Sequence, residues 1–238
     1  MFAGGFLGGV ASGLTGFGFA LSSLPVWALA LPPAVASPLV LACSVVAQLQ
    51  TLPSIWHAID FRRLAVFVIP GIVGIPLGVM LLPKVSPEAF RLALGIALVV
   101  TCGLLLWLNV RVRRESTRAA DAAVGFAGGV LGGLAGLSGV LPTLWAEVHG
   151  WGKDERRAIF QGFNLSILAL AFIVQAVAGV MTLALAPLLL IAIPAAVAGA
   201  WVGRWLYDRV DAKRFSRIIL VLLMLAGAGL VAGAVAKG

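Results

Sequence analysis

The sequence predicts an all-α polytopic membrane protein made of two related halves, and three observations support this. First, 61% of the 238 residues are hydrophobic, only 11% are charged and the mean hydropathy is +1.09, whereas about a quarter of a globular domain is charged. Second, long tracts lack Asp, Glu, Lys and Arg and show no period-2 alternation, which favours membrane helices over a barrel; they cover residues 1–59, 64–83, 158–203 and 218–236. Third, a glycine-rich pattern occurs twice.

The repeat has an offset of 120 residues at its start. Gly-Phe-Leu-Gly-Gly-Val at 5–10 matches Gly-Phe-Ala-Gly-Gly-Val at 125–130, and Gly-Leu-x-Gly at 13–16 matches the same pattern at 133–136. Further on the offset becomes 125, because residues 85–91 resemble residues 210–216. We therefore divide the chain into a first repeat (1–110), a basic cytoplasmic linker (111–121) and a second repeat (122–238).

Each repeat opens with a segment that is too apolar for a soluble loop. It is also too rich in glycine for a regular helix, since an interior Gly costs roughly 1 kcal/mol relative to Ala. Three transmembrane helices follow in each repeat, so conventional counting gives seven or eight membrane segments. The predicted spans are 38–56, 64–82 and 92–108 in the first repeat, and 158–178, 183–201 and 218–236 in the second.

The positive-inside rule decides whether the opening segments cross the bilayer. If all eight segments cross, ten Lys and Arg residues face one side and seven the other; if each opening segment is re-entrant, the division is fourteen to three. We therefore predict six crossings plus two re-entrant hairpins, an inverted second repeat and both termini in the periplasm. Residues 2–13 and 19–31 are each long enough for about half of a 30 Å core.

The glycine turns of the two hairpins are expected to meet near the bilayer centre, because irregular backbone at that depth must be buried in protein or line a cavity. The alternative is that the glycines only allow close helix packing. Both interpretations can hold in part.

No enzyme or cofactor signature is present. Cys43 and Cys102 lie in predicted spans without a partner, and His57 and His149 lie at span ends with no second ligand at a suitable spacing. The net charge of +8 comes from short loops between spans, so we expect no nucleic-acid partner. We predict no catalytic residues, no metal site and no cofactor; the expected partners are a small anion and the lipid bilayer.

The spans contain no charged side chain that could bind an anion. Free N–H groups and the positive ends of half-helices can do so instead, together with hydroxyls and amides. The alternatives are that each hydroxyl bonds to its own helix backbone and that the amides bond between helices. Asn164 is the first choice among these side chains, and Gln175 is a weaker one. The predicted substrate-binding residues are Ser12, Thr15, Gly16, Gly18, Ser22, Ser23, Ser44, Gln48, Gly136, Ser138, Gly139, Gln161 and Asn164.

These features resemble the TauE/SafE family of anion permeases, also called sulfite exporters. The resemblance covers nearly the whole chain: residues 5–18 followed by Ser23-Leu24-Pro25, the helix at 70–78, and their counterparts at 125–142 and 194–203. It implies transport of small sulfur-containing anions, such as sulfite, sulfoacetate or other organosulfonates, across the bacterial inner membrane.

We therefore expect a secondary transporter that works by alternating access. One alternative is an anion channel, or a transporter of another small carboxylate or oxyanion. Another is an intramembrane enzyme or maturation factor, and a third is a structural subunit of a larger complex. The sequence leaves open the direction of transport, the coupling ion and the oligomeric state, a homo-oligomer included.

Overall fold

The computed structural model describes residues 1–16, 18–54, 56–107, 116–149, 151, 153–181, 185–207, 209 and 212–235. All regular structure in these residues is helical. Within this part of the chain, five helices are by length and composition able to cross a membrane: Pro33–Thr51, Phe61–Lys84, Pro87–Leu104, Ala158–Val177 and Ala186–Leu206. The all-α, multi-pass membrane class is therefore confirmed.

The helices follow the predicted order of segments. They are α1 (Phe2–Thr15), α2 (Phe19–Trp27), α3 (Pro33–Thr51), α4 (Phe61–Leu81), α5 (Pro87–Trp107), α6 (Arg118–Ala135), α7 (Val140–His149), α8 (Lys153–Val177), α9 (Ala186–Tyr207) and α10 (Ala212–Val235), with 3₁₀ turns at Leu52–Ser54, Trp56–Ala58 and Leu82–Lys84. The predicted sixth span falls on α10. Its last residue, 236, lies outside the described residues.

Several predicted boundaries are wrong, among them both ends of the first span and the end of the linker. The first span begins at Pro33 rather than 38 and ends at Thr51 rather than 56. Proline suits the first helical position, and Pro53 cannot continue the α-helical hydrogen bonding. The predicted linker is shorter than expected, because α6 already begins at Arg118, where the side chain of Thr117 caps the helix; residues 111–115 lie outside the described residues.

Each opening segment is a helix, a glycine turn and a second helix. Gly16 ends α1 at φ 83° and Gly136 ends α6 at φ 70°, a left-handed conformation that only glycine adopts at little cost. These two glycines therefore break the helices, as the sequence predicts.

The second helix of each opening segment runs back along the first. The indole Nε1 of Trp27, at the end of α2, donates to the carbonyl of Met1 at 3.2 Å. In the second repeat, Nε1 of Trp145 donates to Oδ1 of Asp121 at 2.7 Å. Met1 and Asp121 are related by the same offset of 120 residues, so both segments are helical hairpins closed by a tryptophan at the base.

The two arms of each hairpin differ in length. At 1.5 Å per residue, the second arms α2 and α7, with 9 and 10 residues, are about 14 and 15 Å long. The first arms α1 and α6 have 14 and 18 residues, or about 21 and 27 Å. The second arms are therefore about half as long as a 30 Å core, and the first arms are longer than half of it.

The glycines of the first arms pack along a neighbouring helix. A Cβ on Gly9 would overlap the carbonyl oxygen of Ala196 in α9. Residues 5, 9 and 13 of α1 lie against residues 192, 196 and 200 of α9, and residues 125, 129 and 133 of α6 lie in the same way against residues 67, 71 and 75 of α4. For these six glycines the close-packing interpretation is confirmed, whereas Gly16 and Gly136 act as breaks.

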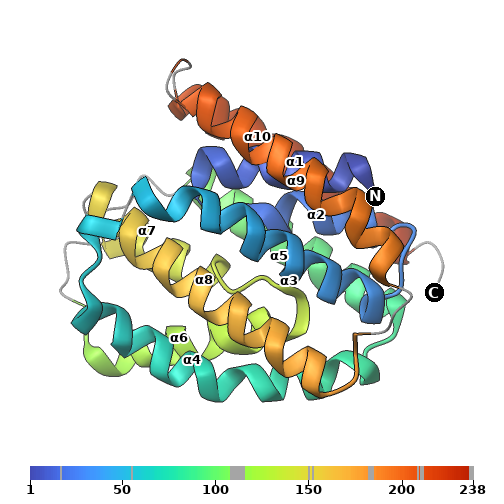
Figure 1. Ribbon diagram of the computed structural model, residues 1–238, viewed down its shortest axis with the longest axis horizontal. Coiled ribbons are helices and arrows are strands. Elements are labelled where there is room, and N and C mark those ends of the chain that lie inside the picture. Colours follow the sequence, from blue (N-terminus) through green and yellow to red (C-terminus); the bar gives the residue numbers. More distant parts are fainter. Residues whose placement is uncertain are drawn as a thin grey trace.

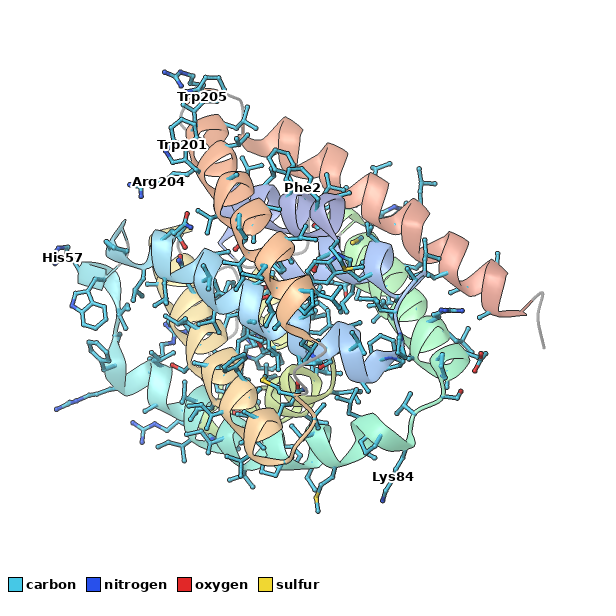
Figure 2. All side chains as sticks on the ribbon, turned by 45° about the vertical axis from the view of Figure 1, so that its right-hand side comes forward. Phe2, His57, Lys84, Trp201, Arg204 and Trp205 are labelled. Atoms are coloured by element: carbon cyan, nitrogen blue, oxygen red, sulfur yellow. The ribbon has the colours of Figure 1, made fainter. Side chains whose placement is uncertain are left out.

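Helices α3 and α8 form the centre of the molecule. Figure 1 shows them side by side across the middle, with α1, α2 and α9 above them and α4 and α6 below. The start of α1 and the end of α10 lie on the same side of this view, at the right. Figure 2 shows Trp201, Arg204 and Trp205 together at the upper left, His57 at the left and Lys84 at the lower right.

Candidate functional site

A stripe of polar side chains lies on each of the two central helices. On α3 the positions 37, 44, 48 and 51 recur at intervals of seven, four and three residues, which places them on one face of the helix. Positions 161, 164 and 175, at intervals of three and eleven residues, likewise lie on one face of α8. The residues are Ser37, Ser44, Gln48, Thr51, Gln161, Asn164 and Gln175, and none is more than 2% exposed.

Two hydrogen bonds join these stripes, one near each end. The side-chain Nε2 of Gln161 donates to Oγ1 of Thr51, and Nε2 of Gln175 donates to Oγ of Ser37 at 2.8 Å. The two bonded positions are fourteen residues apart on both helices, in opposite order along the chain. Helices α3 and α8 therefore run antiparallel in one register.

This register places Gln48 of α3 at the level of Asn164 of α8. The turn of the second hairpin reaches the same level, because Oγ of Ser138 donates to Oδ1 of Asn164. The structure thus brings together three residues that the sequence analysis singled out separately. For Ser138 and Asn164 the contact is a hydrogen bond within the protein, the alternative considered for such side chains.

The turn of the second hairpin also meets the start of α2 in the first hairpin. A Cβ built on Gly136 would lie 2.7 Å from Cγ1 of Val40 and 3.8 Å from Cβ of Ala20. Val40 belongs to the middle of α3, and Ala20 to the first turn of α2. Ser22 follows on the same short helix. The predicted meeting of the two glycine segments therefore takes place beside the middle of α3.

Backbone N–H groups in both glycine turns, those of the predicted Gly16 and Gly136 included, are already used within the protein. Gly16 N–H bonds to the carbonyl of Ser12 at 2.7 Å, Gly136 N–H to Gly132 at 2.9 Å and Leu137 N–H to the carbonyl of residue 131 at 3.2 Å. They close the C-terminal ends of α1 and α6, as such glycine caps do. These N–H groups are therefore not available to a substrate.

The remaining turn residues start the second arms. The carbonyl of Gly18 accepts from the N–H of Ser22 at 3.1 Å, and the carbonyl of Gly139 accepts from the N–H of Thr143 at 3.1 Å. Ser23 donates its hydroxyl to its own helix at Phe19 O, 2.9 Å away, so the local alternative holds for this side chain. The side chain of Thr15 lies outside the described residues.

Several buried polar atoms have no hydrogen-bond partner among the described residues. They are Ser12 Oγ, Ser22 Oγ, Ser44 Oγ, Gln48 Nε2 and Oε1, Gln161 Oε1 and Gln175 Oε1. Leaving such an atom unpaired costs about 1–3 kcal/mol. All of these residues except Gln175 belong to the predicted substrate site. They come from α1, α2, α3 and α8, the helices around the two turns.

The sequence matches the family described as Sulfite exporter TauE/SafE over residues 1–230. The chain belongs to this family. Membership of the TauE/SafE family makes it a membrane protein of an anion-transporter family, which agrees with the resemblance found in the sequence. No curated protein matched the chain. No solved structure matched it either.

In this TauE/SafE protein one charged side chain is buried among the described residues. Asp121, 5% exposed, begins the second hairpin and accepts from Trp145 and from the hydroxyl of Ser116 at 3.1 Å. The sequence analysis missed it by assigning it to the solvated linker. Its position in the first turn of a helix, after the capping Thr117, was the available signal, because carboxylates are favoured there.

We use the name central site for the predicted residues with unpaired buried atoms, all of which have neutral side chains: Ser12, Ser22, Ser44, Gln48 and Gln161. Within the described residues no group of three His, Cys, Asp or Glu side chains could hold a metal ion. Hydroxyls, amides and the N-terminal end of α2 are the groups that it offers to a ligand.

Proposed function

We propose that this TauE/SafE protein is a secondary transporter that moves small sulfur-containing anions, such as sulfite, sulfoacetate or other organosulfonates, across the bacterial inner membrane by alternating access. The observation that carries the proposal is the set of unpaired, buried polar atoms on α1, α2, α3 and α8. Because each atom costs stability when it has no partner, a protein retains such atoms where a ligand satisfies them.

The anion would be held by neutral donors. The hydroxyls of Ser12, Ser22 and Ser44 and the amide of Gln48 supply unpaired groups. The first turn of α2 adds the positive end of a helix, which favours negative charge. We propose that the turns at Gly16, Gly18, Gly136 and Gly139 shape the site. Its wall then includes Ser23, Ser138, Gln161 and Asn164. Substrate binding by Thr15 stays a prediction. A site without fixed positive charge binds an anion weakly enough to release it.

The helix contacts support an inverted repeat. Equivalent helices α3 and α8 run antiparallel. Residue 5 of α1 lies against residue 192 of α9, and residue 125 of α6 lies against residue 67 of α4. These contacts are related by the offsets of 120 and 125 residues that the sequence contains. Exchanging the repeats, 1–110 and 122–238, therefore converts one contact into the other, as expected for a pseudo-two-fold axis in the membrane plane.

The positions of charges and chain ends support the proposed orientation. Arg204 and His57 lie at one end of the molecule and Lys84 at the other. Arg62 and Arg63, at the start of α4, and Arg118, at the start of α6, share one end because α4 and α6 run parallel. We place this basic end in the cytoplasm and the two termini in the periplasm.

The two bonds between α3 and α8 fit the gates of an alternating-access cycle. Gln161 and Thr51 join the helices on the proposed cytoplasmic side of the site. Gln175 and Ser37 join them on the proposed periplasmic side, where Gln175 also donates to the carbonyl of Gly133 at 2.9 Å. Rocking of one repeat against the other would open one bond while the other stays closed.

The test of this function is flux of labelled sulfite or sulfonate into proteoliposomes, with Gln48→Met as the key variant. Methionine has a similar volume and no unpaired amide, so the thermal midpoint should stay equal or rise while flux falls at least tenfold. Ser166→Ala is the control, since that hydroxyl bonds to its own helix at Gly162 O, 2.8 Å away, and its flux should stay at the level of the unmodified protein.

Two results would count against the proposal. Unchanged flux in Gln48→Met would remove the site from the transport path. Flux that increases with concentration without saturation, and without counterflow, would favour a channel over a transporter.

A further inference from the structure

The central site contains both unpaired donors and unpaired acceptors. The hydroxyls of Ser12, Ser22 and Ser44 and the amide nitrogen of Gln48 can donate. The amide oxygens of Gln48 and Gln161 can only accept, and both side chains are 0% exposed. An oxyanion without a hydrogen atom would satisfy the donors but leave both amide oxygens unpaired. The unpaired acceptors therefore indicate that the ligand itself carries a hydrogen-bond donor.

The hydrogen bonds of the neighbouring Thr51 determine which amide atom of Gln161 has no partner. The single hydroxyl hydrogen of Thr51 goes to the carbonyl of Gln48 at 3.0 Å. The Thr51 oxygen must then accept, so it faces the amide nitrogen of Gln161. A flipped amide would place two acceptors against each other or break the bond to Gln48. The oxygen of Gln161 is consequently the unpaired atom.

Gln48 presents a donor and an acceptor next to each other. Its Nε2 and Oε1 are both unpaired and are separated only by the amide carbon. A matching ligand offers an acceptor oxygen and an O–H group side by side. Hydrogen sulfite in its O–H form has this pair, and so does a sulfonate with a nearby hydroxyl; the sulfite dianion and simple alkyl sulfonates have acceptors only.

We propose, on the basis of the anion transport proposed above, that the site selects monoanions that carry their own hydrogen-bond donor. For sulfite this is the hydrogen sulfite monoanion, and among sulfonates it is the hydroxysulfonates, whereas sulfoacetate, a dianion with acceptors only, is disfavoured by such a site. When hydrogen sulfite is the substrate, its acidic proton then crosses the membrane with it. A site lined by Gln and Ser needs no titrating side chain to move it.

The first experiment compares isethionate with propanesulfonate, in which a methyl group replaces the hydroxyl. Both are monoanions of nearly equal size, so they differ only in the donor. In proteoliposomes preloaded with one of them, counterflow should favour isethionate by about tenfold or more, which corresponds to the cost of one unpaired buried acceptor. A ratio near one, with both sulfonates transported, overturns this inference and leaves anion transport intact.

Two variants test which residues cause the preference for isethionate over propanesulfonate. Gln161→Met and Gln48→Met remove the unpaired oxygens, so the isethionate preference should fall towards one in those that still transport. Ser166→Ala should keep the ratio of the unmodified protein. A ratio that persists in both Met variants overturns the assignment to these residues. If sulfite and both sulfonates fail to move, the proposed function itself fails, which is a distinct outcome.

The second experiment varies pH at constant total sulfite, with protein-free liposomes as the background. Sulfite flux should follow the concentration of the monoanion and fall as the dianion replaces it at higher pH. Isethionate flux is the control, because the charge of that substrate does not change. Sulfite flux that rises with the dianion, or that requires Na⁺ to satisfy the amide oxygens, overturns the inference.

Discussion

Gly9 and Gly103 both lie inside helices, but a side chain would meet very different surroundings at the two positions. A Cβ on Gly9 would overlap the carbonyl oxygen of Ala196 and approach the amide nitrogen of Ala200 to 2.8 Å. These are backbone atoms of a regular helix and cannot move singly. A Cβ on Gly103 would have no atom within 4 Å. The same substitution should therefore have opposite effects.

We expect Gly9→Ala to lower the stability by about 1–3 kcal/mol, the usual cost of overpacking. Gly103→Ala should leave it unchanged or raise it by up to about 1 kcal/mol through helix propensity. Thermal unfolding of the two variants in detergent, followed by tryptophan fluorescence, measures the difference. Equal midpoints would contradict the close approach of α1 and α9.

Single residues also explain where prediction from sequence succeeded and where it did not. The burial of Ser44 and Gln48 was predictable because a polar group in an apolar span must face the interior of the bundle. The use of the Gly16 and Gly136 N–H groups in helix caps was not predictable, since it depends on the left-handed geometry of the turn. The helix-start position of Asp121 was readable, but its hydrogen bond to Trp145, a residue 24 positions away, was not, because no local pattern reveals that partner.

Among the elements, the second hairpin has a charged contact between its two arms. Trp145 in the second half of α7 donates to the carboxylate of Asp121 in α6 at 2.7 Å. A hydrogen bond to a charged group contributes about 1.5–3 kcal/mol, more than one between neutral groups. The first hairpin has the neutral equivalent, from Trp27 to the carbonyl of Met1 at 3.2 Å. The charged contact should therefore be the stronger of the two clamps.

A double-mutant cycle with Trp145→Phe and Asp121→Ala tests this clamp. The two substitutions should be coupled by about 1.5–3 kcal/mol, because removing one partner already removes the bond. The free energies come from unfolding of the four proteins in the same detergent. Additive effects, with a coupling below about 0.5 kcal/mol, would show that the two side chains do not depend on each other.

The element order was predictable because composition and glycine spacing act locally along the chain. The register of α3 against α8 was not predictable from the sequence. It rests on Gln175 with Ser37 and on Gln161 with Thr51, and each pair joins residues more than one hundred positions apart. No periodicity within one helix indicates which polar stripe of another helix it will face.

For the whole molecule, the proposed alternating-access cycle uses the two bonds between α3 and α8 as opposing gates. Gln175 and Ser37 join the second half of α8 to the first half of α3, and Gln161 and Thr51 join the first half of α8 to the second half of α3. A transporter with two such gates must never open both. A disulfide that locks one gate should therefore leave the site accessible only through the other.

This can be tested with cysteine pairs at 37 and 175 or at 51 and 161. The native Cys43 and Cys102, both buried and unpaired, are first replaced by Ala, and Ser44→Cys reports access to the site. With 37–175 locked, a membrane-impermeant thiol reagent should label position 44 from the cytoplasmic side only; with 51–161 locked, it should label from the periplasmic side only. Either lock should stop flux, and reduction should restore it. Labelling from both sides in one locked form would mean an open pore, and labelling from the same side in both forms would mean that the two bonds are not opposing gates.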